Sequence, residues 1–582
     1  MCGIVGYTGD KQAAPILLGG LEKLEYRGYD SAGLAVRDEA FPVRVVKSTG
    51  KLRNLVEKTD HGSALSGCCG IGHTRWATHG EPNETNAHPH ISSQFKPTSL
   101  EPEDPDVVGV HNGIIENYEE LKEKLLRHDY AFYSDTDTEI VIKLVDYYYK
   151  KYKIGPIDAI NRMMVRVQGS YALALMFKDY PGEIYVARKD SPMIIGVSDT
   201  ESILASDVPA ILQYTRNVYY IGNLQAARIM PGEVHFFDLN GDEISIERSE
   251  ITWDAEAAEK NGYEHFMIKE IHEQPEAVRN TLNSLLKDGV ISLSESGICE
   301  EVINKMNMIY IVGCGSAWHV GMMMQYVIED LTEIPVRVEL ASEFRYRRLL
   351  LKEGTLVIVI SQSGETADSL EALRIARQQG ATVLGVVNVI GSTIAREADH
   401  VLYTMAGPEI AVATTKAFSA QLTAMYALAV ETARVRGKIT HDQYLYYIEE
   451  LQMLPEKIIH VLEDKERIQW FASKYSNARD MFFIGRGEDY AISLEGSLKM
   501  KEISYIHSEA YAAGELKHGT ISLVEQNTLV IGVLTQSPLL GKTISNLAEC
   551  KARGAYLMGI TSYGNYFVED HVNFTIYITK SD

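Results

Sequence analysis

Apolar and polar positions divide the chain into two halves with different patterns. Up to about residue 245, short apolar runs such as SAGLAV (31–36), VVGVHNGII (107–115) and SYALALMF (170–177) are separated by turn residues. Short apolar runs bounded by turns predict β-strands, and the longer helical pattern of residues 138–152 lies among them. The first half is therefore predicted to be a mixed α/β domain with much sheet.

The second half alternates apolar strands with amphipathic helices. The strand LVIVI (356–360) is followed by a helical pattern at 366–380 and then by the strand ATVLGVVNV (381–389). This alternation predicts βαβ units and a parallel sheet. Ligands of such sheets bind beyond the carboxyl ends of the strands, so we expect a site there.

The second half also contains an internal repeat. MIYIVGCGSAW (308–318) resembles MFFIGRGEDY (481–490), and two more pairs of segments match in the same register, at offsets of 171 to 173 residues. We predict a domain at 1–245, a charged helical connector at 246–300, and α/β repeats at 301–465 and 466–582. The first repeat continues well past its last match, whereas the second stops seven residues after it, so we expect the second repeat to be C-terminally incomplete.

Composition narrows the function classes. The chain has 56 basic and 79 acidic residues, a net charge of −23, which argues against a nucleic-acid binder. Six cysteines in 582 residues are too few for a disulfide scaffold and fit reduced thiols in the cytoplasm. No signal peptide precedes the first strand and no apolar run approaches 18 residues, so we expect no membrane span.

The start of the chain, MCGIVGYTGD, places a cysteine directly behind the initiator methionine. If the methionine is removed, Cys2 carries a thiol and a free α-amine, whose pKa of about 7.7–8.0 lets it act as a base near neutral pH. A cysteine is also often a small buried apolar residue, and position alone does not separate the two interpretations.

Residues that suit an amide substrate occur elsewhere in the first half. Arg75 can bind a carboxylate through two parallel hydrogen bonds, and Asn112 with Gly113 can form an oxyanion hole. Asp137 can hold a substrate ammonium group, whereas Asp135 is expected to cap the following helix. Five histidines, His73, His79, His88, His90 and His111, match no standard zinc spacing, so we predict no metal site.

SQSGET (361–366) follows a strand and opens a helix in the first repeat. Ser361, Ser363 and Thr366 offer hydroxyl groups and Gln362 an amide, next to the free N–H groups of a helix start. We interpret the segment as a phosphate cradle, with plain helix capping as the alternative. In the second repeat, Glu488 and Asp489 would repel an anion, so only the first repeat is expected to bind phosphate.

A charged helix face occurs in the second repeat, within LEGSLKMKEISYIHSEAYAAGELKHG (494–519). Glu495, Lys499 and Glu502 recur at helical spacing, and His518 ends the segment. A solvated stripe of ion pairs is the alternative to a catalytic group. The apolar residues between these charges favour the catalytic interpretation.

Five segments of the first half stand out: CGIVGY (2–7), LEYRGYDSAGLA (24–35), GHTRWATHG (72–80), HNGIIEN (111–117) and SDTDTE (134–139). Together they resemble the N-terminal-nucleophile glutamine amidotransferases, which implies an αββα sandwich. The resemblance implies that Cys2 attacks the amide of glutamine, that Arg75 binds the carboxylate and Asp137 the amine, and that Asn112 and Gly113 hold the oxyanion. It also implies that three residues shape the pocket and its lid: Trp76, Thr78 and His79.

The whole chain resembles the isomerising glutamine–fructose-6-phosphate aminotransferases, which join a glutaminase to two sugar isomerase (SIS) domains. The resemblance implies glutamine and fructose 6-phosphate as substrates, internal transfer of ammonia gated by Trp76, a homodimer, and no cofactor. Glu502 would move a proton between C1 and C2, and His518 of a second subunit would assist ring opening, with Lys499 and Glu495 lining the pocket. The residues expected on the phosphate are Ser316, Ser361, Gln362, Ser363 and Thr366.

Two departures from the family pattern affect these expectations. Ser316 is followed by Ala317 where the family has a second hydroxyl residue. A C-terminal segment with a lysine that forms a Schiff base to the sugar is not found, so the 582 residues are expected to hydrolyse glutamine but to make little glucosamine 6-phosphate. The alternative function is a glutaminase whose SIS half only senses a sugar phosphate.

Overall fold

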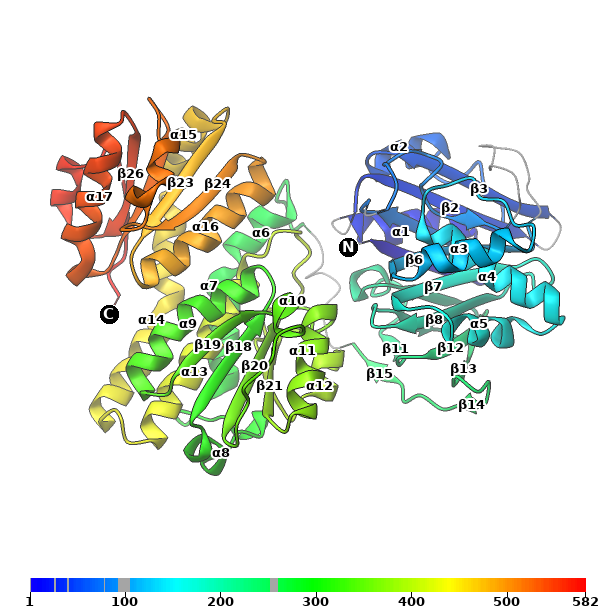
Figure 1. The fold of residues 1–582 in the computed structure, drawn as a ribbon, viewed down its shortest axis with the longest axis horizontal. Coiled ribbons are helices and arrows are strands. Elements are labelled where there is room, and N and C mark those ends of the chain that lie inside the picture. Colours follow the sequence, from blue (N-terminus) through cyan, green and yellow to red (C-terminus); the bar gives the residue numbers. More distant parts are fainter. Residues whose placement is uncertain are drawn as a thin grey trace. The chain divides into compact units, whose positions relative to one another are not determined.

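The computed structural model describes residues 2–25, 28–38, 41–77, 79–92, 105–251 and 260–581. The chain divides into two compact units, Met1–Glu259 and Lys260–Asp582 (Figure 1). Each unit is described by itself.

Two antiparallel sheets form the first unit. The eight-stranded sheet has the order β15-β11-β9-β10-β1-β4-β2-β3, and the seven-stranded sheet has the order β14-β13-β12-β8-β7-β6-β5. The strands of the larger sheet are β1 (Gly3–Thr8), β2 (Ser31–Asp38), β3 (Phe41–Thr49), β4 (Cys69–Arg75), β9 (Ile194–Val197), β10 (Ser202–Ala205), β11 (Asn217–Tyr220) and β15 (Ser249–Glu250). Those of the smaller sheet are β5 (His90–Ile91), β6 (Val107–Ile115), β7 (Gly169–Phe177), β8 (Ile184–Lys189), β12 (Gln225–Met230), β13 (Glu233–Phe237) and β14 (Glu243–Ile244).

Alternating side chains place these sheets in the middle of four layers. Along β7, the odd-numbered residues from Tyr171 to Phe177 pack under helices, whereas the even-numbered residues from Ala172 to Met176 pack between the sheets. The smaller sheet is covered by α3 (Tyr118–Leu126), α4 (Asp137–Tyr152) and α5 (Pro156–Met164), and the larger by α1 (Ala13–Glu22) and α2 (Leu52–Lys58). The expected αββα sandwich is confirmed, as is the helix expected at 138–152.

The second unit contains two parallel five-stranded sheets with the same strand order. The first has the order β19-β18-β20-β21-β22 and the second β24-β23-β25-β26-β27. Their strands are β18 (Met308–Gly313), β19 (Val336–Leu340), β20 (Thr355–Ser361), β21 (Thr382–Val387), β22 (His400–Tyr403), β23 (Asp480–Gly485), β24 (His507–Ala512), β25 (Leu529–Leu534), β26 (Tyr556–Ser562) and β27 (Phe574–Ile578). The internal repeat and the parallel sheets predicted from the sequence are therefore confirmed.

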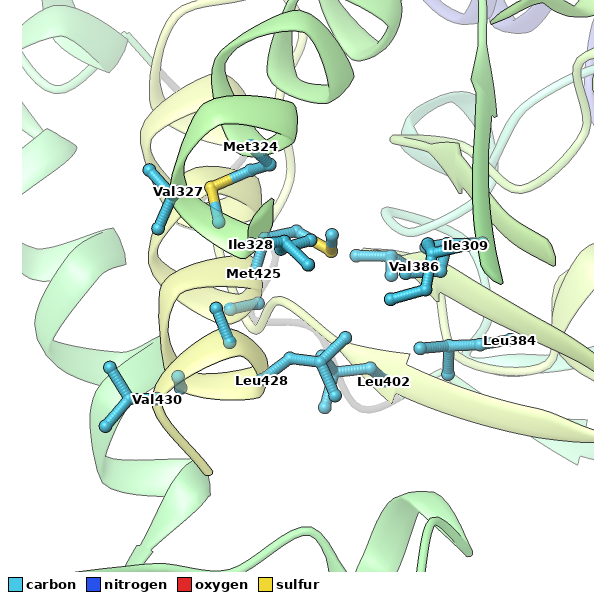
Figure 2. Packing of buried hydrophobic residues seen from close by; sticks show 14 of the residues in the cluster. Ile309, Met324, Val327, Ile328, Leu384, Val386, Leu402, Met425, Leu428 and Val430 are labelled. Carbon is cyan, nitrogen blue, oxygen red and sulfur yellow. The ribbon is translucent and has the colours of Figure 1, made fainter. Parts of the chain in front are cut away.

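Helices cover both faces of each parallel sheet. On one face of the first sheet, α9 (Ser316–Thr332) and α13 (Lys416–Val435) bring Met324, Ile328 and Met425 against the strand residues Ile309 and Val386 (Figure 2). The other face is covered by α10 (Ala341–Phe344), α11 (Ala367–Gln378) and α12 (Thr393–Glu397). The second sheet packs against α15 (Lys465–Tyr475) on one face and α17 (Leu540–Ala552) on the other, and α16 (Glu488–Ser504) follows β23.

The segment predicted as a connector contains α6 (Phe266–His272), α7 (Gln274–Leu285), the hairpin β16 (Leu286–Lys287)–β17 (Val290–Ile291) and α8 (Glu300–Lys305). Ala277 and Leu282 of α7 pack against α13 and against α14 (His441–Glu463). The boundaries proposed at 245, 300 and 465 stay predictions.

Two further expectations concern disulfides and membranes. All six cysteines are free, as expected. Among the helices of the described ranges, none is both long and apolar enough to cross a membrane.

Candidate active sites

Cys2 lies immediately before β1 and contacts Trp76, the residue that directly follows β4. The backbone N–H of Trp76 donates to the Cys2 sulfur at 3.2 Å, and the thiol lies 3.5 Å from the carbonyl oxygen of Trp76. Burial raises the pKa of the Cys2 thiol, which the N–H of Trp76 opposes. The charge of Arg75 also lowers this pKa and that of Asp137 raises it. A thiol in this setting needs a base to become a nucleophile.

Asn112 is oriented by a buried histidine. Its side-chain amide nitrogen donates to the carbonyl oxygen of Cys2 at 2.9 Å, while its amide oxygen lies 3.0 Å from Nε2 of His73. Burial lowers the pKa of His73 to about 3, so the ring is neutral. Because Nε2 also faces the carbonyl oxygen of His111 at 3.1 Å, it carries the ring proton and donates. The amide of Asn112 is thereby fixed with its N–H groups toward Cys2.

Gly113 follows Asn112 on β6 with φ of +127°. A Cβ atom at this position would lie 2.1 Å from the carbonyl oxygen of Ser170 on the neighbouring strand. Only glycine fits this backbone, which leaves its N–H unhindered by a side chain, as an oxyanion hole requires.

Arg75 ends β4 and is buried. Its guanidinium donates to the carbonyl oxygens of His79, of Gly80 at 3.1 Å and of Glu81 at 3.4 Å. The predicted carboxylate clamp therefore also holds the loop that follows β4.

Asp137 is the first residue of α4 and is buried. Its Oδ2 accepts the backbone N–H of Ile115 at 2.9 Å, which ties the helix start to the strand that carries Asn112 and Gly113. The helix cap predicted for Asp135 is wrong: Thr136 is the N-cap, and its hydroxyl accepts the N–H of Glu139 at 3.3 Å. Asp135 instead pairs with the side chain of Asn86.

Two predicted pocket residues lie on the loop after β4. Trp76 is 41% exposed, and its ring meets the ring of Tyr29 edge-on at 5.4 Å. The ring of His79 meets that of Tyr118 at 5.5 Å, also edge-on. Thr78 lies outside the described residues.

The histidines pack against one another within the first unit. The rings of His73 and His88 stack at 4.1 Å, and those of His88 and His90 meet at 5.0 Å. Burial lowers the pKa of each of the three, so they are neutral core side chains near neutral pH. Within the described ranges no cluster of three or more His, Cys, Asp or Glu side chains is arranged to hold a metal ion.

The predicted phosphate segment connects β20 to α11. The Ser361 hydroxyl accepts the N–H of Gly364 at 3.0 Å and lies 3.1 Å from that of Thr366, and the hydroxyl of Ser363 accepts the N–H of Glu365 at 3.2 Å. Thr366 is the N-cap of α11 but makes no capping hydrogen bond with its side chain. The hydroxyl of Thr366 therefore does not cap the helix, which was the alternative interpretation of this segment.

Ser316 connects the two repeats. It begins α9 beyond the carboxyl end of β18, the strand next to β20. Its hydroxyl donates to Oε1 of Glu495 on α16 at 2.8 Å and accepts from Nζ of Lys499 at 3.2 Å. The structure thus brings Ser316 to the charged helix of the second repeat.

Glu495 is buried and surrounded by donors. Its Oε2 accepts from Nδ1 of His319 at 2.7 Å, and Lys499 lies 3.4 Å from Oε1. Burial alone would raise the pKa of Glu495, but His319, Lys499 and Ser316 together lower it below its ordinary value. His319 was missed from the sequence, although it lies three residues after Ser316 on the same helix.

Glu502 and His518 are less enclosed. Lys499 lies 2.5 Å from Oε2 of Glu502, so the lysine bridges two carboxylates of one helix face. The prediction that Glu495, Lys499 and Glu502 share one helix face is therefore confirmed. His518 is exposed on a short 3₁₀ helix, Leu516–His518, and among the described residues no hydrogen bond joins it to Glu502.

The equivalent loop of the second repeat is filled by a side chain of the protein. The buried carboxylate of Asp489 accepts the N–H of Thr535 at 3.0 Å and of Gln536 at 3.2 Å, and it accepts the Thr535 hydroxyl as well. Thr535 and Gln536 directly follow β25, the strand that matches β20. A carboxyl group of the protein itself therefore takes up these backbone N–H groups.

The segment between β22 and α13 is anchored by two residues that sequence reasoning missed. Glu270 of α6 accepts the N–H of Ile410 at 2.6 Å and of Ala411 at 3.1 Å. Asn388 donates its backbone N–H to the carbonyl oxygen of Gln362 at 3.1 Å and its side-chain amide to Gly407 at 2.7 Å. The segment is thereby tied to the predicted phosphate loop.

Glu270 makes stability depend on pH. Burial raises the pKa of Glu270 from its ordinary 4.5 to about 7. Between pH 4.5 and 7 the folded chain holds a proton on Glu270 that the unfolded chain releases. The contribution of Glu270 to stability is therefore full below pH about 4.5 and is lost as the pH rises to about 7. The loss is roughly 3 kcal/mol.

We expect Glu270→Gln to remove this dependence of stability on pH, measured as thermal unfolding midpoints between pH 4.5 and 8. Glu276→Gln, which changes an exposed carboxylate of α7, should keep it; a slope unchanged in Glu270→Gln would refute the assignment.

Known protein families match both units. Residues 90–213 match the glutamine amidotransferase domain, and residues 302–431 and 474–582 each match the SIS domain. A solved C-terminal domain of glucosamine-fructose-6-phosphate aminotransferase from Francisella tularensis is similar at 41% identity and a TM-score of 0.54, over 56% of this chain and 92% of that chain.

Similar proteins also cover the full chain. A glutamine–fructose-6-phosphate aminotransferase (isomerizing) from Caldanaerobacter subterraneus subsp. tengcongensis is 50% identical over 99% of this chain and 93% of its own length. Proteins of the same name from Clostridium tetani and Methanosarcina acetivorans are 50% and 43% identical, over all of this chain and 93% and 94% of their own lengths. The chain therefore belongs to the family of isomerising glutamine–fructose-6-phosphate aminotransferases.

Proposed function

We propose that the protein converts fructose 6-phosphate and glutamine into glucosamine 6-phosphate and glutamate. The observation that carries the proposal is that one chain combines a thiol held beside Asn112 and Gly113 with a hydroxyl-rich loop and an acid–base helix in two SIS repeats. The atoms balance, because one water is consumed when glutamine is hydrolysed and one is released when ammonia condenses with the sugar carbonyl.

In the glutaminase half, Cys2 is the nucleophile. Once Met1 is removed, the α-amine of Cys2 takes the thiol proton, which compensates for the burial that raises the pKa of the thiol. Asn112 and the N–H of Gly113 stabilise the oxyanion that forms on the amide carbonyl. Arg75 and Asp137 bind the carboxylate and the ammonium of glutamine, and Trp76, Thr78 and His79 close the pocket.

In the sugar half, the loop of Ser361, Gln362, Ser363 and Thr366 holds the phosphate, together with Ser316. Ammonia released in the first unit condenses with C2 of the open-chain sugar, and Glu502 then moves a proton from C1 to C2. Lys499, which lies between Glu495 and Glu502, lines the pocket and pairs with both carboxylates. The Schiff-base role of the family is assigned to none of these residues.

The protein is further proposed to be a cytoplasmic homodimer. His518 is exposed, which suits a side chain that completes the site of a second copy by assisting ring opening. The six free cysteines suit a reducing compartment. The alternative of a sensor without synthesis is not favoured, since the full-length relatives are named as enzymes that act on the sugar phosphate.

The proposal is tested by following both products. The protein extended by the family's C-terminal lysine segment, supplied with glutamine and fructose 6-phosphate, should form glutamate and glucosamine 6-phosphate in equal amounts, measured by mass spectrometry. The 582 residues alone are expected to release glutamate but to form little glucosamine 6-phosphate. Glutamate formation that fructose 6-phosphate leaves unchanged, with no amino sugar, would favour the sensor instead.

Replacing Ser361 and Ser363 together by alanine should weaken fructose 6-phosphate binding. Losing two hydrogen bonds to a charged phosphate suggests a cost of roughly 3–6 kcal/mol, measured by calorimetry. The matched control is Thr535→Val with Ser537→Ala in the second repeat, where Asp489 fills the loop. Unchanged affinity in the first variant, or an equal loss in the control, would show that phosphate binds elsewhere.

A further inference from the structure

A completely buried ion pair lies on the first turns of α4. The side chains of Glu139 and Lys143 are both 0% exposed, and Oε1 of the glutamate lies 2.7 Å from Nζ of the lysine. Two buried charges are costly unless they are paired and hydrogen-bonded. Neither residue has a part in the reaction proposed above, so the pair needs another explanation.

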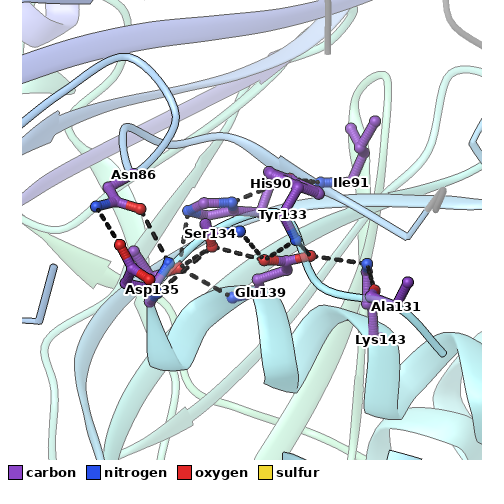
Figure 3. Close-up of polar contacts among 10 residues, drawn as sticks. Asn86, His90, Ile91, Ala131, Tyr133, Ser134, Asp135, Glu139 and Lys143 are labelled. Carbon is purple, nitrogen blue, oxygen red and sulfur yellow. Dashed lines mark hydrogen bonds and ion pairs between the residues drawn. The ribbon is translucent and has the colours of Figure 1, made fainter. Parts of the chain in front are cut away.

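Glu139 and Lys143 hold the turn that precedes the helix (Figure 3). Glu139 accepts the N–H groups of Tyr133 at 3.0 Å and Ser134 at 2.7 Å, and the Ser134 hydroxyl at 2.6 Å. Lys143 donates to the carbonyl oxygen of Ala131. These directed bonds fix residues 131–134 onto the helix.

A second set of contacts continues this support up to Asp137. Nε2 of His90 lies 3.1 Å from the hydroxyl of Thr136, the residue that caps the helix. Asn86 accepts the N–H of Asp135 at 3.0 Å. The two residues before Asp137 are therefore fixed by neighbouring strands and loops, and the residue two positions after it is Glu139 itself.

We propose that the Glu139–Lys143 pair is a positioning unit that fixes Asp137 for recognition of the α-ammonium of glutamine. This inference rests on the proposed role of Asp137. An ion-paired hydrogen bond depends on distance and angle, so the carboxylate must be held in place before the substrate binds. Apolar side chains of similar size would fill the same space, but they could not hold the turn by hydrogen bonds to its backbone.

The test removes both charges together, as Glu139→Gln with Lys143→Met, so that no unpaired charge stays buried. Hydrolysis of glutamine is compared with hydrolysis of glutaramate, which lacks the α-amino group. We expect the KM for glutamine to rise roughly tenfold, the value of one charge-assisted hydrogen bond, with kcat little changed. Hydrolysis of glutaramate and alkylation of Cys2 by iodoacetamide should be unchanged, because neither uses the ammonium site.

Two controls separate positioning from general stability. Asp146→Asn with Lys150→Met removes another i,i+4 ion pair of the same helix, in which Nζ of Lys150 lies 3.1 Å from Oδ2 of Asp146. This variant should leave the preference for glutamine over glutaramate unchanged. In an Asp137→Asn background, the Glu139/Lys143 changes should have no further effect on that preference. If the double variant fails to fold, Lys143→Arg keeps the charge, displaces the donor from Ala131, and should give a smaller shift of the same kind.

A folded variant that prefers glutamine as strongly as the wild type, or that loses activity on glutamine and glutaramate equally, would overturn the inference. Failure of the wild type to hydrolyse glutamine would instead refute the proposed function. The two failures are therefore distinguishable.

Discussion

Replacing Cys2 by alanine should lower the rate of glutamate release from glutamine by four orders of magnitude or more. Loss of a nucleophile removes the covalent pathway, and typical losses are about 10⁴ to 10⁶. Asn112 and Gly113, the residues proposed to stabilise the oxyanion, supply no attacking atom. The change leaves the sugar half untouched, so the affinity for fructose 6-phosphate, measured by calorimetry, should be retained.

Intact-mass analysis checks the same prediction by chemistry. The wild type should lack Met1 and should take up one molecule of a glutamine-like electrophile, at Cys2. Cys68→Ala, a change at another partly exposed thiol, is the control and should label as the wild type does. Labelling that persists in Cys2→Ala would place the nucleophile elsewhere.

Replacing Glu502 by glutamine should stop proton transfer in the sugar half. A positioned general base typically contributes 10² to 10⁴ in rate, and glutamine keeps the size of the side chain without its basicity. In D₂O, exchange of the C1 proton of fructose 6-phosphate should be lost together with glucosamine 6-phosphate formation, both followed by NMR. Glutamine hydrolysis should continue, because it depends on the first unit.

The matched control for this change is Glu525→Gln, an exposed carboxylate of the same repeat. It should exchange the C1 proton at the wild-type rate. Exchange that survives in Glu502→Gln would assign the proton transfer to another group, with Glu495 the first to examine because it contacts the same lysine.

The sheets and the repeat could be predicted because their signals are local. Residues 171–177 alternate between two apolar environments, and LVIVI (356–360) recurs in register as LVIGV (529–533) of the buried strand β25, so each segment carries its own evidence. The face of Glu495, Lys499 and Glu502 could be predicted for the same reason, since helical spacing alone brings the three together.

Long-range contacts could not be read in this way. Glu270 lies in a charged stretch that looks solvated, yet it is buried against Ile410, 140 residues away. The orientation of Asn112 depends on His73, which lies on another strand. The cap of α4 depends on whether Asp135 or Thr136 accepts the N–H of Glu139, and in the structure it is Thr136. Asp489 was expected only to repel an anion, whereas in the structure its own carboxyl group accepts the N–H of Thr535.

The most direct test of the account follows nitrogen from one unit to the other. The protein extended by the family's C-terminal lysine segment is given fructose 6-phosphate and glutamine labelled with ¹⁵N at the side-chain amide, in the presence of excess unlabelled ammonium, and the amino sugar is analysed by mass spectrometry. If ammonia passes internally from the Cys2 site to the SIS half, glucosamine 6-phosphate should carry ¹⁵N at C2 despite the unlabelled pool. Formation of unlabelled glucosamine 6-phosphate, or release of all ¹⁵N as free ammonium without amino sugar, would contradict the account.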